Sequence, residues 1–407
     1  MRKLFCLLVL FMSSLYGFSQ SHPYLFVWAG DDAKQSNDFL AVLDADPKSP
    51  RYGQAVASVA VPGPTGTPHH TELEMPADGF LLADAFESGH TVLFDLRNPL
   101  HPTLVTSFGD LDGYMHPHTY VRLANRHVLA TFQYHGGHDP KSDGGGLVEF
   151  EERGHLLRSS SAMDPNARSE LIRPYSLVVV PALDRVVSTN FSMHFKTDGD
   201  SRTLQVWRLS DLKLLKTIML PQGPNHAGEA PGEPRLLADG KTVLVHTFHC
   251  GLYQLDGLST ASPSATLVKT FDQGLCAVPL RLGHYWLQTL FSGHALVAYD
   301  ISDIGHIKEV SRVTFDDQQK PHWIAADESG RRIVLNSGEY GAHRLYMVNF
   351  NPETGALALD KDFRDAASNQ PGISFDGKTW PHGFHGDAYP HGTVFSRTAG
   401  QTIAGAN

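Results

Sequence analysis

Residues 80–99 read FLLADAFESGHTVLFDLRNP, and this stretch decides the fold. Two apolar runs, FLLADAF and TVLFDL, stand on either side of a short polar turn that contains Gly89. Each run has the composition and alternation of a β-strand, and the second closes in a turn at Asn98 and Pro99. The stretch therefore predicts two consecutive antiparallel strands of one sheet.

The same pattern returns along the chain, which indicates a repeat architecture. Further copies of the first run are HVLATFQ at 127–133, RVVSTNF at 185–191, TVLVHTF at 242–248, YWLQTLF at 285–291 and RIVLNSG at 332–338. A preceding inner strand is expected to start near His70, His116, Tyr175, Arg235, Leu280 and His322, with spacings of 42 to 60 residues. Spacing of that order is typical of the blades of a β-propeller.

A seventh blade is expected to be built from both ends of the chain. The segment from Tyr24 contains three apolar runs but no inner strand, and HGTVFSR at 391–397 supplies the missing one. Pairing of these two segments would close the ring and leave no exposed sheet edge. The sequence thus predicts an all-β, seven-bladed β-propeller as a single domain over residues 20–407, because no linker divides it into two sandwiches.

Composition agrees with a β-rich globular protein and excludes some partners. The 407 residues are 41% hydrophobic and 19% charged, with 37 Gly and 25 Pro that suit many turns. The formal net charge of −10, without any Lys/Arg-rich run, argues against nucleic acid as a partner. The unusual feature is the presence of 23 His beside only 3 Cys.

The first residues are typical of a secretory signal peptide, predicted here as residues 1–19. Arg2 and Lys3 precede an apolar run from Leu4 to Leu15 that is too short to span a membrane comfortably, so no membrane insertion is expected. A periplasmic or secreted protein follows. Cys250 and Cys276 would remain after cleavage, either as one disulfide or as two buried thiols.

Histidines gather at or just before the expected inner strands. The stretches are PHH with His69 and His70, MHPH with His116 and His118, PHW with His322, and PHGFH with His382 and His385. Inner strands of a propeller surround one axis, so four blades would direct imidazoles to one point. Neutral imidazole is a common ligand of copper and zinc. We therefore predict a copper site, with zinc as the alternative metal, held by His69, His70, His116, His322 and His382.

The remaining histidines are expected to be structural or peripheral. They include His226, His246, His249, His284 and His294, together with His135 and His138 in a Gly/Asp-rich, solvent-exposed loop. Glu72 and Asp387 are predicted to orient the metal ligands or to join them. The alternative interpretation is that the histidines only form hydrogen bonds in polar loops. GISFDGKT at 372–379 matches a P-loop pattern, but Trp380 and Pro381 follow where that motif needs a helix, so nucleotide binding is not expected.

Several of these stretches resemble the selenium-binding protein / methanethiol oxidase family. They are DFLAVLDADPKSPRYGQ at 38–54, PHHTELE at 68–74, GYMHPHTYVRL at 113–123, VAYDISD at 297–303 and WPHGFHGDAYPHG at 380–392. The resemblance implies a seven-bladed propeller and, for secreted bacterial members, a copper-dependent oxidase. It carries metal-associated histidines over to His69, His70, His116 and His382. The segment after the HH pair contains no Cys, so selenium binding is not expected.

The enzymatic hypothesis follows from this resemblance and from the imidazole pattern. A copper-dependent periplasmic oxidase would convert methanethiol, oxygen and water to formaldehyde, hydrogen sulfide and hydrogen peroxide, with His118 or His385 as proton carrier. The rival hypothesis is a periplasmic carrier that binds copper or zinc at the same imidazoles without turnover. A protein-docking propeller whose histidines are incidental is the least favoured class.

Overall fold

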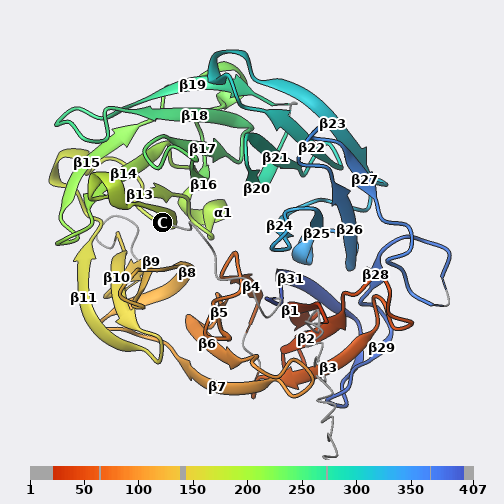
Figure 1. The fold of residues 1–407 in the computed structure, drawn as a ribbon. Coiled ribbons are helices and arrows are strands. Elements are labelled where there is room, and N and C mark those ends of the chain that lie inside the picture. Colours follow the sequence, from red (N-terminus) through yellow and green to blue (C-terminus); the bar gives the residue numbers. More distant parts are fainter. Residues whose placement is uncertain (1–21, 64–65, 138–143, 272–273, 367, 398–407) are drawn as a thin grey trace, which may run out of the picture.

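The computed structural model describes residues 22–63, 66–137, 144–271, 274–366 and 368–397. In these residues the strands form seven blades arranged around one axis, so the predicted all-β propeller is confirmed (Figure 1). The predicted signal peptide and His138 lie outside the described residues. No helix in the described ranges is long and apolar enough to cross a membrane.

Blades 1 to 4 are numbered along the chain from the composite blade. Blade 1 contains β31 (Ala388–Phe395), β1 (Tyr24–Asp31), β2 (Phe39–Asp44) and β3 (Ala55–Ala60), from the inside outward. Blade 2 contains β4 (Pro68–Thr71), β5 (Phe80–Ala85), β6 (His90–Asp95) and β7 (Thr103–Phe108). Blade 3 contains β8 (Tyr114–Arg122), β9 (Val128–His135), β10 (Gly146–Glu151) and β11 (His155–Ser161). Blade 4 contains β12 (Pro174–Val180), β13 (Arg185–Asn190), β14 (Thr203–Arg208) and β15 (Leu214–Met219).

The other three blades complete the ring. Blade 5 contains β16 (Pro231–Leu236), β17 (Val243–Thr247), β18 (Gly251–Asp256) and β19 (Ser264–Thr270). Blade 6 contains β20 (Cys276–Leu282), β21 (Tyr285–Leu290), β22 (Ala295–Asp300) and β23 (Lys308–Thr314). Blade 7 contains β24 (Trp323–Ala326), β25 (Arg332–Asn336), β26 (Arg344–Phe350) and β27 (Leu357–Leu359), and β28 (Ile373–Ser374) also pairs with β26.

Short elements lie between these strands. A two-stranded hairpin of β29 (Lys378–Thr379) and β30 (His385–Gly386) precedes β31. The helical segments are α1 (Phe195–Asp198), η1 (Pro165–Ala167), η2 (Pro181–Leu183), η3 (Pro224–His226), η4 (Ile304–His306) and η5 (Gly338–Tyr340).

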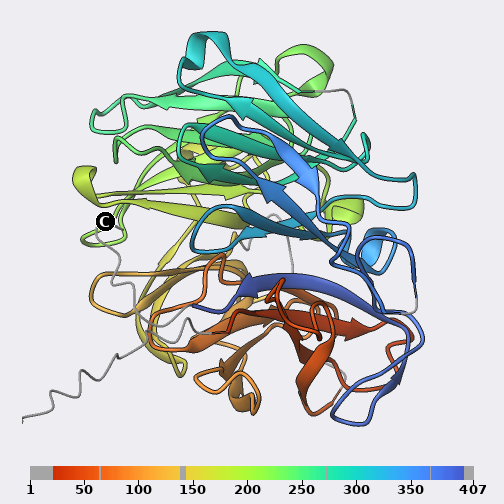
Figure 2. The ribbon, with the colours of Figure 1, turned by 45° about the vertical axis from the view of Figure 1, so that its right-hand side comes forward.

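The two ends of the chain close the ring, as the sequence predicted. Strand β31 pairs antiparallel with β1, with Leu25 opposite Phe395 and Gly30 opposite Tyr389. Figures 1 and 2 both show these two strands side by side at the junction of red and dark blue ribbon. Blade 1 is tied to blade 7 by the Trp323 indole, whose Nε1 donates to the Thr393 carbonyl oxygen at 2.8 Å. The closing blade is therefore integrated on both sides.

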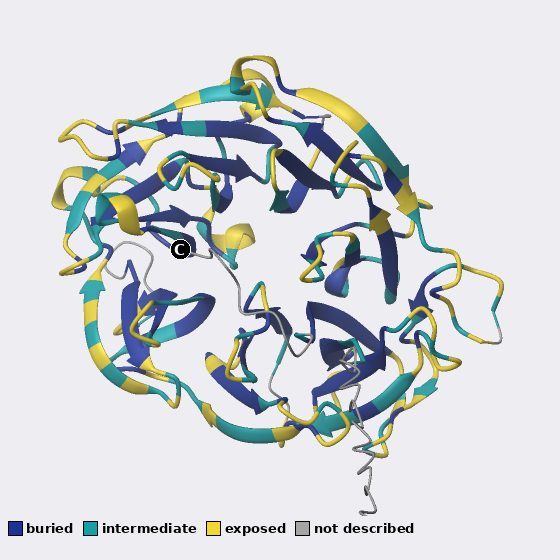
Figure 3. Ribbon diagram, viewed as in Figure 1, coloured by how far each residue is buried: buried dark blue, intermediate teal, exposed yellow. Residues whose placement is uncertain are grey.

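The hydrophobic core lies between neighbouring blades rather than at one centre. One cluster joins β1 and β2 of blade 1 to blade 7, for example Val27 and Leu43 with Met347. Another joins blade 1 to blade 2 through Trp28 and Phe94, whose rings are 5.5 Å apart. Figure 3 shows buried residues concentrated on the inner and middle strands, whereas the outermost strands alternate with exposed positions. This pattern fits sheets that are covered on both faces except at the perimeter.

Most inner strands carry a bulge where their register against the second strand shifts. The shifts lie between Pro68 and Thr71, Pro117 and Tyr120, Pro174 and Leu177, Pro231 and Pro234, Cys276 and Pro279, and, on β31, Pro390 and Thr393. A bulge sets two residues against one on the partner strand and redirects their side chains. Proline is tolerated there because an inner strand is an edge strand. The side chains of the residues just after these prolines therefore do not follow the usual alternation between the two faces of the sheet.

Candidate metal centre

Five buried histidines meet near the axis of the propeller. They are His69 and His70 on β4, His118 on β8, His322 directly before β24, and His391 on β31, and we call them the histidine group. Their inner strands belong to four consecutive blades, in the order 7, 1, 2 and 3. At most 5% of any of these residues is exposed. Imidazoles from four blades therefore converge near the axis, as predicted, but not all of the histidines that meet there are the predicted ones.

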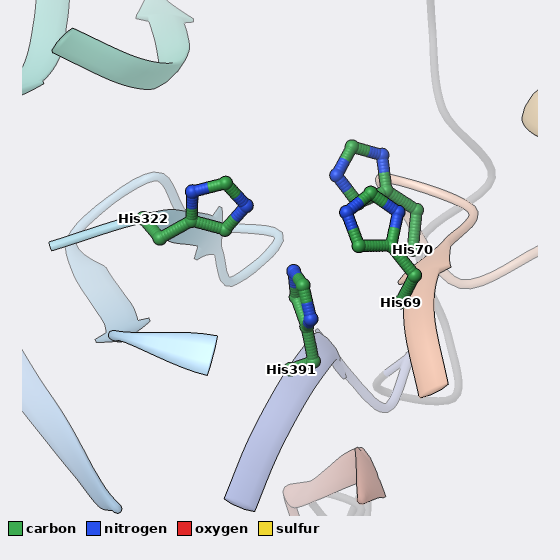
Figure 4. A group of neighbouring side chains, drawn as sticks. All are labelled: His69, His70, His322 and His391. Carbon is green, nitrogen blue, oxygen red and sulfur yellow. The ribbon is translucent and has the colours of Figure 1, made fainter. Parts of the chain in front are cut away.

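The rings of the histidine group lie in direct contact. His69 and His70 stack with centroids 4.1 Å apart, and His391 approaches His69 to 4.4 Å. His322 lies 5.0 Å from His391, and His118 lies 4.3 Å from His70. One ring nitrogen from each of four members lies within 4.8 Å of the others. Figure 4 shows these four side chains, which come from three separate segments of the chain, pointing toward a common centre; they are His69, His70, His322 and His391.

The ring nitrogens of the group lack the partners that buried polar atoms normally have. Both nitrogens of His69 and of His391, and Nε2 of the other three members, have no hydrogen-bond partner among the described residues. Such orphaned atoms are costly unless something else satisfies them. Burial lowers the pKa of His69 to about 4, and burial lowers the pKa values of the other members below their usual range. The imidazoles are therefore neutral and present lone pairs, which is the form that binds a metal.

Two carboxyl groups lie beside the imidazoles of the group. Asp84 on β5 accepts the His70 backbone N–H at 2.7 Å, and its other oxygen lies 3.7 Å from His69 Nδ1. Burial raises the pKa of Asp84 well above its usual range. Glu339 on η5 lies 3.1 Å from His391 Nδ1. Burial alone would raise the pKa of Glu339, but the neighbouring His391 lowers it overall. Carboxylates in such positions fix the orientation of a ligating imidazole.

A third carboxylate approaches from the opposite side of the axis. Glu233 on β16 has Oε1 at 4.0 Å from His70 Nδ1. Its Oε2 accepts Ser176 Oγ at 2.6 Å and an Arg235 N–H at 2.9 Å. Tyr175 covers His118, with ring centroids 3.8 Å apart. Blades 4 and 5 thus close the group with a carboxylate and an aromatic ring rather than with further histidines.

One glycine permits the approach of blade 1 to blade 2. A Cβ on Gly392 would lie 2.6 Å from the Thr71 backbone nitrogen and 2.9 Å from the His69 carbonyl oxygen. Only a residue without a side chain fits there, because both neighbours are backbone atoms. Gly392 therefore lets β31 bring His391 against His69.

The structure does not bring three of the predicted site residues into the group. His116 has a positive φ of 56° and its Nδ1 lies 2.8 Å from the Phe86 carbonyl oxygen, against Phe86 and Tyr134. His382 lies in the hairpin before β31, with Nδ1 2.7 Å from Ser58 Oγ. His385 is exposed on β30. The predicted ligands His69, His70 and His322, and the predicted proton carrier His118, are brought together.

The residues predicted to orient the ligands have other partners. Glu72 accepts hydrogen bonds from the Arg122 guanidinium and the Leu82 N–H. Asp387 accepts the Gly377 N–H at 2.7 Å. Among the described residues, neither forms a hydrogen bond or ion pair with a side chain of the histidine group. The carboxylates that lie beside the group are Asp84, Glu339 and Glu233, none of which the sequence singled out.

His391 was missed although the sequence contained its signal. HGTVFSR was identified as an inner strand, and His391 is its first residue. The rule that histidines at inner-strand starts face the axis therefore applied to it. The tripeptide Pro-His-Gly occurs twice, at Pro381 and at Pro390, and the second copy contributes to the group.

The remaining sequence predictions have clear outcomes. Cys250 and Cys276 form a disulfide between blades 5 and 6, which decides between the two alternatives. His135 is exposed, as expected, whereas His246 is fully buried and accepts the Glu233 N–H. A separate group lies at the junction of blades 4 and 5 and consists of Asp200, Glu229 and His249. One possible ligand atom of each residue lies within 4.8 Å of those of the other two. Residues 372–379 form β28, a turn and β29 rather than a phosphate-binding loop and helix.

Comparison with known proteins agrees with this geometry. The chain is 26% identical over 386 residues to a methanethiol oxidase from Hyphomicrobium sp., covering 87% of this chain and 81% of that protein. The predicted resemblance to the selenium-binding protein / methanethiol oxidase family is confirmed. A selenium-binding protein of Sulfolobus tokodaii, described as hypothetical, has a TM-score of 0.74 at 16% identity, covering 94% of this chain and 96% of its own.

More distant propellers share the fold alone. A periplasmic gluconolactonase of Pseudomonas aeruginosa has a TM-score of 0.61 at 12% identity, covering 92% of this chain and 99% of its own. No family model matches the chain.

Proposed function

We propose that this protein is a copper-dependent periplasmic oxidase of small thiols. The observation that carries the proposal is the group of five buried, neutral imidazoles with unpartnered nitrogens on four consecutive inner strands. The similarity to a methanethiol oxidase supports a small thiol as substrate and oxygen as co-substrate. The disulfide and the predicted signal peptide support an oxidising compartment.

The donor set fits copper. His69, His70, His322 and His391 would hold the ion, because four imidazole nitrogens within 4.8 Å suit copper and, next to it, zinc. Bound copper supplies a soft acceptor for thiolate sulfur and a redox partner for oxygen. His116 and His382 are left out of this proposed ligand set because they contact other residues.

The residues around the group have separate tasks. Asp84 and Glu339 hold His69, His70 and His391 in orientation, and the fully buried surroundings exclude bulk water. His118 is the predicted proton carrier that lies beside the ligands, and its unpartnered Nε2 is the atom that would hold and release a proton. His385, exposed on the hairpin, is not assigned this role.

The reaction is a two-electron oxidation of the methyl carbon coupled to a two-electron reduction of dioxygen. Methanethiol, oxygen and water give formaldehyde, hydrogen sulfide and hydrogen peroxide, one molecule of each. The methyl carbon loses two electrons and its C–S bond breaks with water as the oxygen source. Dioxygen gains the two electrons and two protons that make peroxide.

A non-catalytic copper or zinc carrier is the alternative, and one observation favours it. Four imidazoles are enough to close a tetrahedral coordination sphere, whereas a catalytic site keeps an open position. A closed site would bind metal without turnover.

One experiment separates the two functions. Protein purified without a His-tag and loaded with copper is analysed for metal and then mixed with methanethiol in air. The oxidase predicts about one copper per chain, a thiol-induced change in the copper spectrum, and equal amounts of sulfide and peroxide. Copper-loaded protein that yields no sulfide from small alkyl thiols, but transfers copper to a chelator, would establish the carrier instead.

A further inference from the structure

A cavity opens at the other end of the inner strands. Its volume is about 860 Å³, in the range of small-molecule sites. Its wall contains residues that follow or end the inner strands of five blades, including Leu73, Arg235, Leu280, Ala326 and Phe395. The cavity is therefore built around the same axis as the histidine group.

The inner strands run from the histidine group to this cavity. On β24 the path leads from His322 to Ala326, and on β31 from His391 to Phe395. Four residues of extended chain cover about 13 Å. The histidines and the cavity thus mark the two ends of one short path along the axis.

One ion pair stands between the cavity and the histidine group. Arg235 lines the cavity and donates to Glu233 Oε2 at 2.9 Å. Glu233 Oε1 lies 4.0 Å from His70 Nδ1. Arg235 also donates to the Pro279 carbonyl oxygen at 3.0 Å, which fixes its guanidinium across the path. Two side chains, those of Arg235 and Glu233, therefore connect the cavity to the His70 imidazole.

One arginine of the cavity wall, Arg281, forms no ion pair within 4.0 Å among the described residues. Among the described residues, the hydrogen bond formed by the Arg281 guanidinium goes to the Gly283 carbonyl oxygen at 3.0 Å. By contrast, Arg397 in the same wall pairs with Glu328 at 3.2 Å. The wall also contains the carboxylates of Glu74, Asp327 and Glu328, of which the exposed Glu74 interacts with Arg281 at longer range. Arg281 is thus the wall cation that is available to an incoming anion.

We propose that this cavity is the vestibule through which small soft anions, thiolate and hydrosulfide, pass to and from the histidine group, and that Arg281 attracts them. This inference rests on the proposed function. It adds the route by which the sulfur compound reaches the histidine group and the charge that the compound carries. Leu73, Leu280 and Leu282 in the wall accommodate a short alkyl group, and Arg281 complements the sulfur charge. Arg235, facing Glu233, forms the inner end of the route.

The test uses azide as a probe, since this small anion binds copper and its binding is followed by absorbance without any turnover. Rapid mixing of azide with the copper-loaded protein gives an association rate constant. We expect Arg281→Gln to lower that constant about 3- to 10-fold and to weaken its dependence on salt, because the attraction of a charged cleft is electrostatic. Arg281→Lys, which keeps the charge, should restore most of the rate. Copper content should be unchanged in both variants.

A second pair of variants tests the route itself. Ala326→Trp fills the cavity and should slow azide binding. Arg208→Gln replaces a half-buried arginine on β14 that pairs with Asp211; it is the matched control for Arg281→Gln and should leave the rate unchanged. Unchanged rates in both Arg281→Gln and Ala326→Trp would overturn the vestibule. Azide binding needs no thiol oxidation, so a vestibule that admits azide in a protein without oxidase activity would refute the proposed function alone.

Discussion

Two copies of one tripeptide provide the sharpest test of the metal centre. Pro381-His382-Gly383 and Pro390-His391-Gly392 have the same local sequence, and each histidine can be replaced by Ala. His391 is fully buried and lies 4.4 Å from His69, whereas His382 contacts Ser58 Oγ. We expect His391→Ala to lose copper and His382→Ala to keep it.

The magnitude follows from the number of donors that the change removes. Loss of a residue that merely orients a ligand typically costs 10- to 100-fold in metal affinity, so loss of one of four donors should cost at least about 100-fold. A 100-fold weaker affinity removes about 2.7 kcal/mol of the stabilisation that saturating copper gives the folded protein. The increase in Tm upon copper addition should therefore shrink by several degrees in His391→Ala and remain unchanged in His382→Ala.

The assay compares each variant with itself, with and without copper. His391→Ala leaves Glu339 without its 3.1 Å partner and empties a packed position, so its metal-free Tm is expected to fall as well. The copper-induced difference in Tm, together with elemental analysis, cancels that effect. Copper retention in His391→Ala combined with copper loss in His382→Ala would refute the proposed ligand set.

Four further outcomes are expected. Glu339→Gln should weaken copper binding 10- to 100-fold in a chelator competition, because the Gln amide keeps the shape but loses the charge beside His391; an unchanged affinity would remove Glu339 from the site. Burial lowers the pKa of His246 to about 3, so below about pH 6.5 this histidine takes up a proton in the unfolded chain but not in the folded protein. The free energy of unfolding of the metal-free protein should therefore fall by about 2.7 kcal/mol between pH 6.5 and 4.5. Urea unfolding at pH 7 and 4.5 should show a smaller decrease in this free energy for His246→Asn than for the native protein. The double replacement of Cys250 and Cys276 by Ala should lower the free energy of unfolding by about 3 kcal/mol while sulfide production continues, and loss of activity in a folded double variant would contradict this. Deletion of the residues after Asp387 removes β31 and should abolish cooperative unfolding, so a truncated protein with the native Tm would be incompatible with the closing strand.

The fold was predictable because each blade is a local repeat. Second and third strands such as 80–85 and 90–95 are short apolar runs, buried along almost their whole length and joined by short turns, so their pattern is visible in the sequence. Inner strands were located less accurately. The expected starts at Arg235 and Leu280 fall near the ends of β16 and β20, since proline and a bulge interrupt the alternation of these strands.

The histidine group was predictable where a residue follows a proline in an inner strand or directly before one. His69, His118, His322 and His391 all have this position, and His70 follows His69 in the same bulge. His116 stands before the proline, and His382 has the right tripeptide in a hairpin outside the ring. Local sequence cannot distinguish the two Pro-His-Gly copies, because the difference lies in which copy pairs with β1.

The carboxylates around the imidazoles could not be found in the same way. Asp84 belongs to a second strand, Glu339 to a short helical turn and Glu233 to a blade across the axis. Nothing in their own sequence surroundings marks them. Their role arises from packing between blades that are far apart in the chain, which requires the three-dimensional ring.

The pairing of β31 with β1 makes the assembly of the histidine group depend on complete folding. His391 lies on the closing strand, so its imidazole reaches His69 only after the two ends of the ring have joined. An incompletely closed chain offers at most the donors of blades 2, 3 and 7 and would bind copper more weakly. Copper would therefore be retained preferentially by finished molecules, and a partly folded chain would be spared a redox-active ion in an open, water-accessible site.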